Sequence, residues 1–156
     1  MSDIISSDLP FTPEQRGTLD AVLPMVIPAS ADGVMPSAAE VDFLQWMAEF
    51  ARDAVEAVQA ALDHIDDAAR DTAGGAFAGL DAGGRQQVID ALFAGEPRAL
   101  RALTDQVMAC YYSHERVLEA LGANPGPPFP DGNEVKQADL SLLEPVRERG
   151  KIWRDA

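Results

Sequence analysis

Apolar side chains recur along most of the chain at spacings of three and four residues, the period of an amphipathic α-helix. The first stripe follows Thr12-Pro13-Glu14-Gln15, where threonine can cap a helix, proline suits its first turn and glutamine completes a capping box. Pro24 lies inside the stripe, and its ring would clash with the carbonyl of Asp20. We therefore expect a kink at Pro24, or an early end near Leu23, in a helix whose apolar face consists of Leu19, Val22, Leu23, Val26 and Ile27.

Two more stripes fill the middle of the chain after a loop at residues 28–36. A second capping box, from Ser37 to Glu40, predicts the start of a helix with apolar positions at Phe43, Trp46, Met47 and Phe50. The next stripe consists of Val55, Val58, Leu62, Ile65 and Ala69. The pattern leaves open whether these stripes belong to one long helix or to two helices that separate near Arg52-Asp53.

Glycines divide the second half of the chain. Five of them between Gly74 and Gly84 predict a turn, after which Asp81 can cap a short helix with Val88, Ile89, Leu92 and Phe93. A last long stripe then runs to a helix-ending glycine, Gly122, through Leu100, Leu103, Val107, Tyr111, His114, Leu118 and Leu121. Because no run of alternating β-branched residues occurs, we predict an all-α fold, a compact bundle of about five helices.

The chain changes character after this bundle. We divide it into an N-terminal extension (1–11), a helical domain (12–122) and an extended, proline-rich C-terminal arm (123–156) with at most one short turn before Pro145. The arm is too apolar to be left in water, so it either packs on its own helices or clasps a partner. For the second alternative, the candidate contact residues are Pro128, Phe129, Pro130, Leu142, Leu143, Pro145, Val146, Arg147, Arg149, Trp153 and Arg154.

Composition narrows the classes of partner. The chain has 156 residues, 47% of them hydrophobic, and 26 acidic against 12 basic side chains give it a net charge of −14. This charge repels phosphate backbones and disfavours a role in nucleic-acid binding. Residues 1–73 carry 14 acidic and 3 basic side chains, whereas residues 145–156 are net positive, so a basic tail end follows an acidic body.

The sequence also bears on the cell compartment of the protein and on whether a membrane segment anchors it. No apolar run approaches the roughly 20 residues that span a bilayer, and the first residues have neither the basic region nor the apolar segment of a secretory signal. The single cysteine, Cys110, cannot form an internal disulfide and excludes a paired-cysteine zinc or haem site. We expect a cytoplasmic protein.

The sequence offers few residues for catalysis. It lacks a dinucleotide fingerprint, a phosphate-binding loop, a nucleophile elbow and a zinc-protease motif, and Gly74 to Gly79 is interpreted as an ordinary turn. A hard cation could bind Asp63, His64, Asp66 and Asp67, but a charge run is usually a solvated helix face, and that is our interpretation. Of the remaining candidates, we expect His114, Cys110 and the aromatic residues Phe43, Trp46 and Phe50 to belong to the core.

Several short motifs occur in a fixed order. They are Phe11-Thr-Pro-Glu-Gln-Arg-Gly-Thr-Leu-Asp-Ala-Val with Val26-Ile27-Pro28 after it, Val41-Asp42-Phe43-Leu44, Phe77-x-x-Leu80 with Arg85, Thr104 to Tyr112, Pro127-Pro128-Phe129-Pro130-x-Gly132, and Asp139 to Arg149. In this order and spacing they resemble the gluconate 2-dehydrogenase subunit 3 family, the small subunits of flavoprotein sugar dehydrogenases.

The resemblance implies an accessory subunit without catalytic residues. Family members are partners of a large FAD-dependent subunit of the glucose-methanol-choline oxidoreductase type, often with a separate cytochrome c subunit. They support the folding, flavin loading or export of the large subunit, so this chain would hold no cofactor and its partner would hold FAD. Many members carry a twin-arginine signal, and none precedes Phe11 here. The complex would therefore be cytoplasmic, unless a leader was removed or another subunit directs export.

Two other interpretations remain open at the level of sequence. The chain could be a free-standing chaperone or adaptor that binds its client transiently, in which case it should be a soluble monomer by itself. It could also be a small helical metal-binding protein or enzyme built on Asp63, His64, Asp67 or His114.

Overall fold

The computed structural model describes residues 9–96, 98–123, 125–126 and 138–150. They form helices and connecting turns, and no strand occurs among them. The chain divides into two compact units, residues 1–125 and 126–156. The predicted all-α fold is confirmed.

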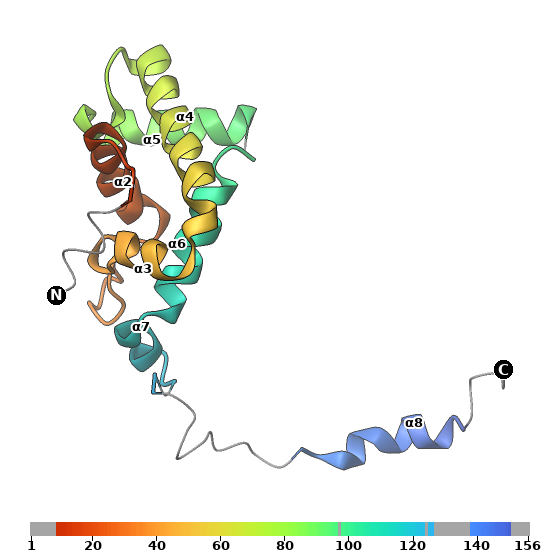
Figure 1. Ribbon diagram of the computed structural model, residues 1–156. Coiled ribbons are helices and arrows are strands. Elements are labelled where there is room, and N and C mark those ends of the chain that lie inside the picture. Colours follow the sequence, from red (N-terminus) through yellow and green to blue (C-terminus); the bar gives the residue numbers. More distant parts are fainter. Residues whose placement is uncertain (1–8, 97, 124, 127–137, 151–156) are drawn as a thin grey trace. The chain divides into compact units, whose positions relative to one another are not determined.

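The described residues of the first unit form six α-helices, whose arrangement is drawn in Figure 1. They are α2 (Pro13–Val26), α3 (Phe43–Phe50), α4 (Val55–Ala73), α5 (Ala82–Gly95), α6 (Arg101–Ser113) and α7 (Glu115–Ala120). Short 3₁₀ turns lie between them at Ala38–Glu40, Arg52–Ala54 and Phe77–Gly79. The longest helix, α4, contacts α2, α5 and α6 and so forms the centre of the bundle.

The core lies where these four helices meet. Val58, Leu62 and Ile65 of α4 are completely buried, as their spacing of three and four residues predicts for one helix face. Neighbouring elements contribute the large buried side chains Leu19, Met47, Phe77, Val88, Leu103, Val107, Tyr111 and Val117. Tyr111 also donates a hydrogen bond of 2.7 Å from its hydroxyl to the carbonyl of Pro36, so its polar end is satisfied inside the core.

The predicted start of the first helix is confirmed. The Thr12 hydroxyl accepts a hydrogen bond from the Gln15 backbone N–H (3.1 Å), and the Gln15 side chain accepts one from the Thr12 N–H (3.0 Å). The expected early end near Leu23 is wrong, because α2 continues through Pro24 to Val26. Proline lies near the end of the helix, where it removes one hydrogen bond only, and the Ile27 N–H still donates to the Leu23 carbonyl.

The second capping box, from Ser37 to Glu40, forms as predicted, but it begins a short 3₁₀ turn and not the helix that contains Phe43. Ser37 caps the short turn Ala38–Glu40, and α3 begins at Phe43 with its own cap, the Asp42 carboxylate, which accepts from the Gln45 N–H at 3.0 Å. At Ala51 the backbone leaves the helical region (φ −140°, ψ 37°). The question left open by the sequence is therefore settled in favour of two helices, α3 and α4.

The last apolar stripe also covers two helices. His114 has an extended backbone (φ −75°, ψ 135°), which ends α6 at Ser113 and allows α7 to begin at Glu115. The single long helix predicted from Leu100 to Leu121 is thus wrong, because the continuous stripe conceals a break of one residue. Gly122 has φ +72° and ends α7, as predicted for a glycine that follows a helix.

The second unit is more helical than the sequence indicated. A 3₁₀ turn at Leu140–Leu143 leads directly into α8 (Glu144–Glu148), and Pro145 lies in the first turn of α8. The 3₁₀ turn is the one short turn expected before Pro145, and that prediction is confirmed. The sequence analysis did not predict that the chain continues from this turn into α8, where proline is compatible with a helix start because its missing N–H needs no partner. Pro128, Phe129, Pro130, Trp153 and Arg154 lie outside the described residues.

Candidate partner-binding surfaces

Apolar side chains of the second unit lie on one side of its helical segment. Leu142 and Val146 are four residues apart and Leu143 and Val146 three, so they fall on one helix face. Their exposed fractions are 75% for Leu142, 45% for Leu143 and 57% for Val146, and Leu140 is 56% exposed. We call Leu140, Leu142, Leu143 and Val146 the α8 apolar face.

This face is held in a defined helical geometry. The Asp139 carboxylate accepts hydrogen bonds from the Ser141 backbone N–H (3.0 Å) and the Ser141 hydroxyl (2.7 Å). The same two bonds, the hydroxyl first, lower the pKa of Asp139, so the carboxylate stays charged at the start of the helical segment. Arg147 and Arg149 lie at the other end of the segment, where positive charge suits a helix terminus.

A second candidate surface is a groove on the first unit. It is an open hollow of about 780 Å³ between α3 and the chain around the α6–α7 junction. We call it the α3–α7 groove, and it is lined by Asp42, Gln45, Trp46, Glu49, Phe50, Cys110, Ser113, His114, Glu115 and Arg116. None of our candidate contact residues lies here, although Trp46 and Phe50, an aromatic pair four residues apart beside Glu49, were a signal in the sequence.

The aromatic residues of α3 divide between the core and this groove. Phe43 is buried (2% exposed), whereas Phe50 is 66% exposed and its ring centroid lies 6.1 Å from that of the half-buried Trp46. The prediction that all three belong to the core is therefore wrong for Phe50. It is the last residue of α3, beyond the part of the helix that faces the bundle.

Cys110 and His114 lie at the floor of the groove. Cys110 is only 2% exposed, and burial together with the charge of Asp42 raises its pKa to about 12, so the thiol is protonated at neutral pH. His114 is half-buried, and its Nδ1 atom is buried without a hydrogen-bond partner in the part of the chain that the structure describes. The prediction that Cys110 belongs to the core is confirmed.

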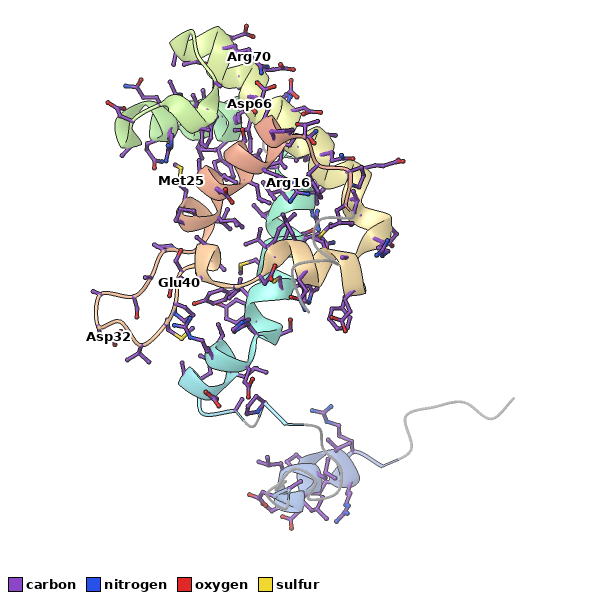
Figure 2. All side chains as sticks on the ribbon, turned by 60° about the vertical axis from the view of Figure 1, so that its left-hand side comes forward. Arg16, Met25, Asp32, Glu40, Asp66 and Arg70 are labelled. Atoms are coloured by element: carbon purple, nitrogen blue, oxygen red, sulfur yellow. The ribbon has the colours of Figure 1, made fainter. Side chains whose placement is uncertain are left out.

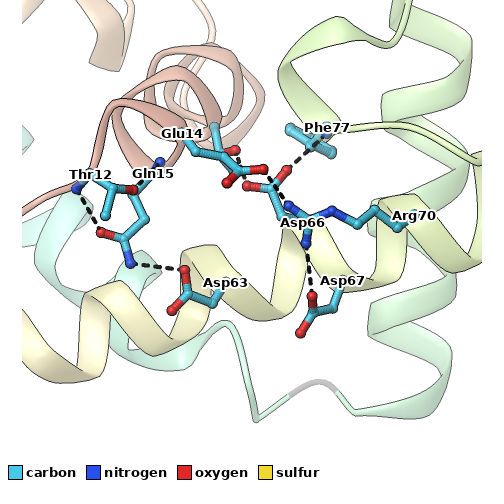
Figure 3. A network of polar contacts seen from close by, with 9 residues as sticks. Thr12, Glu14, Gln15, Asp63, Asp66, Asp67, Arg70 and Phe77 are labelled. Atoms are coloured by element: carbon cyan, nitrogen blue, oxygen red, sulfur yellow. Dashed lines mark hydrogen bonds and ion pairs between the residues drawn. The ribbon is translucent and has the colours of Figure 1, made fainter.

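The acidic run of α4 has a mainly structural role (Figure 3). Asp66 is buried, and its carboxylate accepts hydrogen bonds from the Thr18 hydroxyl (2.5 Å) and the Phe77 N–H (2.9 Å), which join α2, α4 and the turn at Phe77. The prediction of a uniformly solvated face is wrong for this residue. Asp63 and Asp67 are exposed and bind the Gln15 amide (2.8 Å) and Arg70 (2.9 Å) respectively.

Arg70 extends this network to α2, since it also pairs with Glu14. His64 stands apart, with its Nε2 atom 3.6 Å from a Glu96 carboxylate oxygen, a distance too long for a hydrogen bond. Among the residues that the structure describes, no three side chains of the metal-binding types converge on one point.

A small apolar cavity completes the surface features of the first unit. It has a volume of about 220 Å³, lies between α2, α4, α5 and α6, and is lined mainly by aliphatic side chains, with the exposed Phe93 at its edge. In the described part of the chain, no helix has the length and apolar character needed to cross a membrane.

The described residues thus form an all-α protein with two exposed surfaces that contain large apolar side chains, the α8 apolar face and the α3–α7 groove. The sequence profile of the gluconate 2-dehydrogenase subunit 3 family matches residues 13–125, which is more than half of the chain, and the chain therefore belongs to this family. The match ends where the first structural unit ends, so the C-terminal motifs lie outside it. No curated protein and no solved structure matches the chain.

Proposed function

We propose that the chain is the non-catalytic small subunit of a dehydrogenase complex, and that it binds and stabilises a large FAD-dependent subunit that oxidises a sugar or a glycoside. Family membership supports a dehydrogenase subunit. The observation that carries the binding role is the α8 apolar face, four large apolar side chains within seven residues, all exposed. Contiguous apolar surface on a soluble protein usually marks an interaction site.

The physical role of the α8 apolar face in the proposal is that of an anchor. Leucine and valine side chains each contribute about 1.5–3 kcal/mol when they pass from water into a well-packed interface. Because the Asp139 cap holds the segment in a helical conformation, less conformational entropy is lost on binding. Arg147 and Arg149 at the end of the segment would pair with carboxylates at the rim of such an interface.

The remaining parts of the proposal concern cofactor and compartment. FAD and the sugar bind to the large subunit, a cytochrome c subunit completes the electron-transfer chain where one is present, and this chain contributes no catalytic group. We propose that the complex is cytoplasmic. The free thiol of Cys110 agrees with this proposal, because the cytoplasm is a reducing compartment in which thiols stay unpaired.

Co-expression tests the proposal. The large subunit from the chain's own host is produced alone, with the wild-type chain, and with the variant Leu142→Ser/Leu143→Ser/Val146→Ser. We expect soluble, flavin-containing large subunit only with the wild type, and a binding loss of at least about 100-fold for the variant, since three anchors are removed. The control is Val34→Ser/Leu121→Ser, which changes two side chains exposed to a similar degree, 57% and 56%, in the first unit.

Two results would contradict the proposal. If the large subunit is equally soluble and equally loaded with flavin without this chain, stabilisation is wrong. If the serine variant and the control bind equally well, the α8 apolar face is not the anchor. A wild-type complex that dissociates during gel filtration, while yield still depends on the chain, would identify a transient chaperone instead.

A further inference from the structure

The α3–α7 groove combines aromatic surface with unbalanced negative charge. Trp46 and Phe50 supply the apolar part, and three carboxylates, those of Asp42, Glu49 and Glu115, lie around it. Asp42 is engaged by the Gln45 N–H at 3.0 Å, whereas Glu49 and Glu115 form no ion pair among the described residues. Such a surface is complementary to a cation that carries an apolar neighbour.

The cations of the groove region do not neutralise these carboxylates. Arg116 lines the groove, but it pairs at 3.4 Å with Glu40, which lies beside α7 and outside the groove lining (Figure 2). Arg52, two residues after Phe50, donates to the Ala48 carbonyl at 2.6 Å and does not line the groove. The groove thus retains a negative charge, in agreement with the strongly acidic first half of the sequence.

A buried polar atom at the floor of the groove has no hydrogen-bond partner among the described residues. His114 Nδ1 is buried without a hydrogen-bond partner in the described part of the chain, and such atoms are rarely left unpaired in native proteins. The open volume of about 780 Å³ lies within the range of pockets that enclose a ligand of several side-chain lengths. An occupant with a backbone or side-chain polar group could therefore satisfy the imidazole while its apolar part covers Phe50.

We infer that the α3–α7 groove is a second docking site for the large dehydrogenase subunit, and that it receives a segment in which a lysine or arginine stands next to an aromatic or aliphatic side chain. The apolar side chain covers Phe50 and Trp46, and the cation lies between Glu49 and Glu115, where the Trp46 ring also favours positive charge. This inference rests on the proposed function, because it assumes a large subunit, but it uses a different unit of the chain from the α8 apolar face.

The test uses the full-length tagged chain, isolated with its flavin-containing subunit from the native host. The groove variants are Glu49→Lys/Glu115→Lys and, separately, Phe50→Ser, which alters a side chain that is 66% exposed and so spares the fold. The matched control, Asp71→Lys/Asp90→Lys, makes the same change in net charge at exposed residues outside the groove. Circular dichroism and thermal unfolding verify the fold of each variant.

We expect each groove variant to bind the large subunit at least about tenfold more weakly than the control does. A loss of this size is typical when a partly desolvated charge pair or an aromatic anchor is removed from an interface. A carbodiimide, which joins carboxylates to lysine amines without a spacer, locates the contact, and a crosslink from Glu49 or Glu115 to the large subunit supports the inference. A docked arginine would not be joined by the carbodiimide, which needs an amine. In that case the supporting result is that Glu49→Lys/Glu115→Lys and Phe50→Ser both lose binding.

Each contrary result has a separate meaning. If the wild-type chain holds no flavin-containing subunit, the proposed function fails and this inference fails with it. If the wild type holds that subunit and the groove variants bind as tightly as the control, only the groove inference is overturned. Self-association of the isolated chain in sedimentation experiments, abolished by Phe50→Ser, would assign the groove to a second copy and would likewise overturn it.

Discussion

At the scale of single residues, Asp66 shows how a charged side chain can hold a helical bundle together. Its carboxylate is buried, yet both of its oxygens accept hydrogen bonds, one from α2 and one from the turn before α5. Such a group stabilises the fold only while every donor around it is paired. The neighbouring Asp63 makes one bond at the surface, so the two aspartates form a natural comparison.

The first prediction compares these two residues. Asp66→Ala leaves the Phe77 N–H and the Thr18 hydroxyl without their acceptor in the core, and we expect the free energy of unfolding to fall by about 3 kcal/mol. Asp63→Ala should lower it by about 1 kcal/mol or less, because water replaces the lost acceptor. Urea unfolding followed by circular dichroism measures both, and equal losses would contradict the structural role of Asp66.

The second prediction concerns Cys110. Burial and the charge of Asp42 raise its pKa to about 12, and its thiol is 2% exposed. At pH 8 we expect alkylation of the native protein to be at least about 100-fold slower than that of the unfolded protein, because only the accessible thiolate reacts. Mass spectrometry over time measures the two rates. Comparable rates would show that the floor of the α3–α7 groove is open to solvent.

At the scale of elements, helix caps and helix-ending glycines could be recognised in the sequence, whereas the breaks between neighbouring helices could not. The Thr12 capping box depends on two residues three positions apart and the helix end at Gly122 on a single glycine, and the sequence displays both directly. The breaks at Ala51 and His114 fall inside apolar stripes that continue across them, because the two helices on either side use the same core. Periodicity alone therefore left the break between α3 and α4 open and missed the break between α6 and α7.

Long-range contacts limited the prediction of the candidate sites in the same way. Asp66 is buried because Thr18, 48 residues earlier, lies against it, and nothing near Asp66 in the sequence indicates this. The exposure of Phe50 likewise depends on where α3 ends relative to the bundle. The candidates in the C-terminal arm, by contrast, were chosen from composition alone, since many large apolar residues follow the last predicted helix of the bundle, and their role in binding stays a prediction.

The third prediction tests the cap of α2. Thr12→Ala removes the acceptor for the Gln15 N–H, and we expect a loss of about 1 kcal/mol in the free energy of unfolding. Thr12→Ser keeps a hydroxyl at the same place and should change it by only a few tenths of that amount. Thermal unfolding of the two variants is the measurement, and equal effects would show that the hydroxyl contributes little.

At the scale of the whole molecule, the hydrophobic core and the proposed binding face lie in different units. Every core residue found among the described residues lies between Leu9 and Val117, in the first unit. The side chains of the α8 apolar face are exposed and belong to the second unit. The family profile matches residues 13–125, within the first unit. The first unit is thus the part that contains the hydrophobic core, and the proposed anchor lies in the second unit.

The fourth prediction follows from this division. A chain shortened to residues 1–125 should keep its free energy of unfolding within about 0.5 kcal/mol of the full-length value, because no identified core residue is removed. The same shortening should abolish tight binding of the large subunit. A marked loss of stability in chemical unfolding would show that the removed segment packs on its own helices, the alternative that the sequence left open.

The most direct test of the central claim is a native pull-down with the tagged full-length chain from its own host, followed by native mass spectrometry and visible absorbance. We predict a complex of fixed stoichiometry with a large oxidoreductase subunit that shows the flavin spectrum. Colourless, monodisperse protein without a partner, under conditions in which the large subunit is present, would contradict the account.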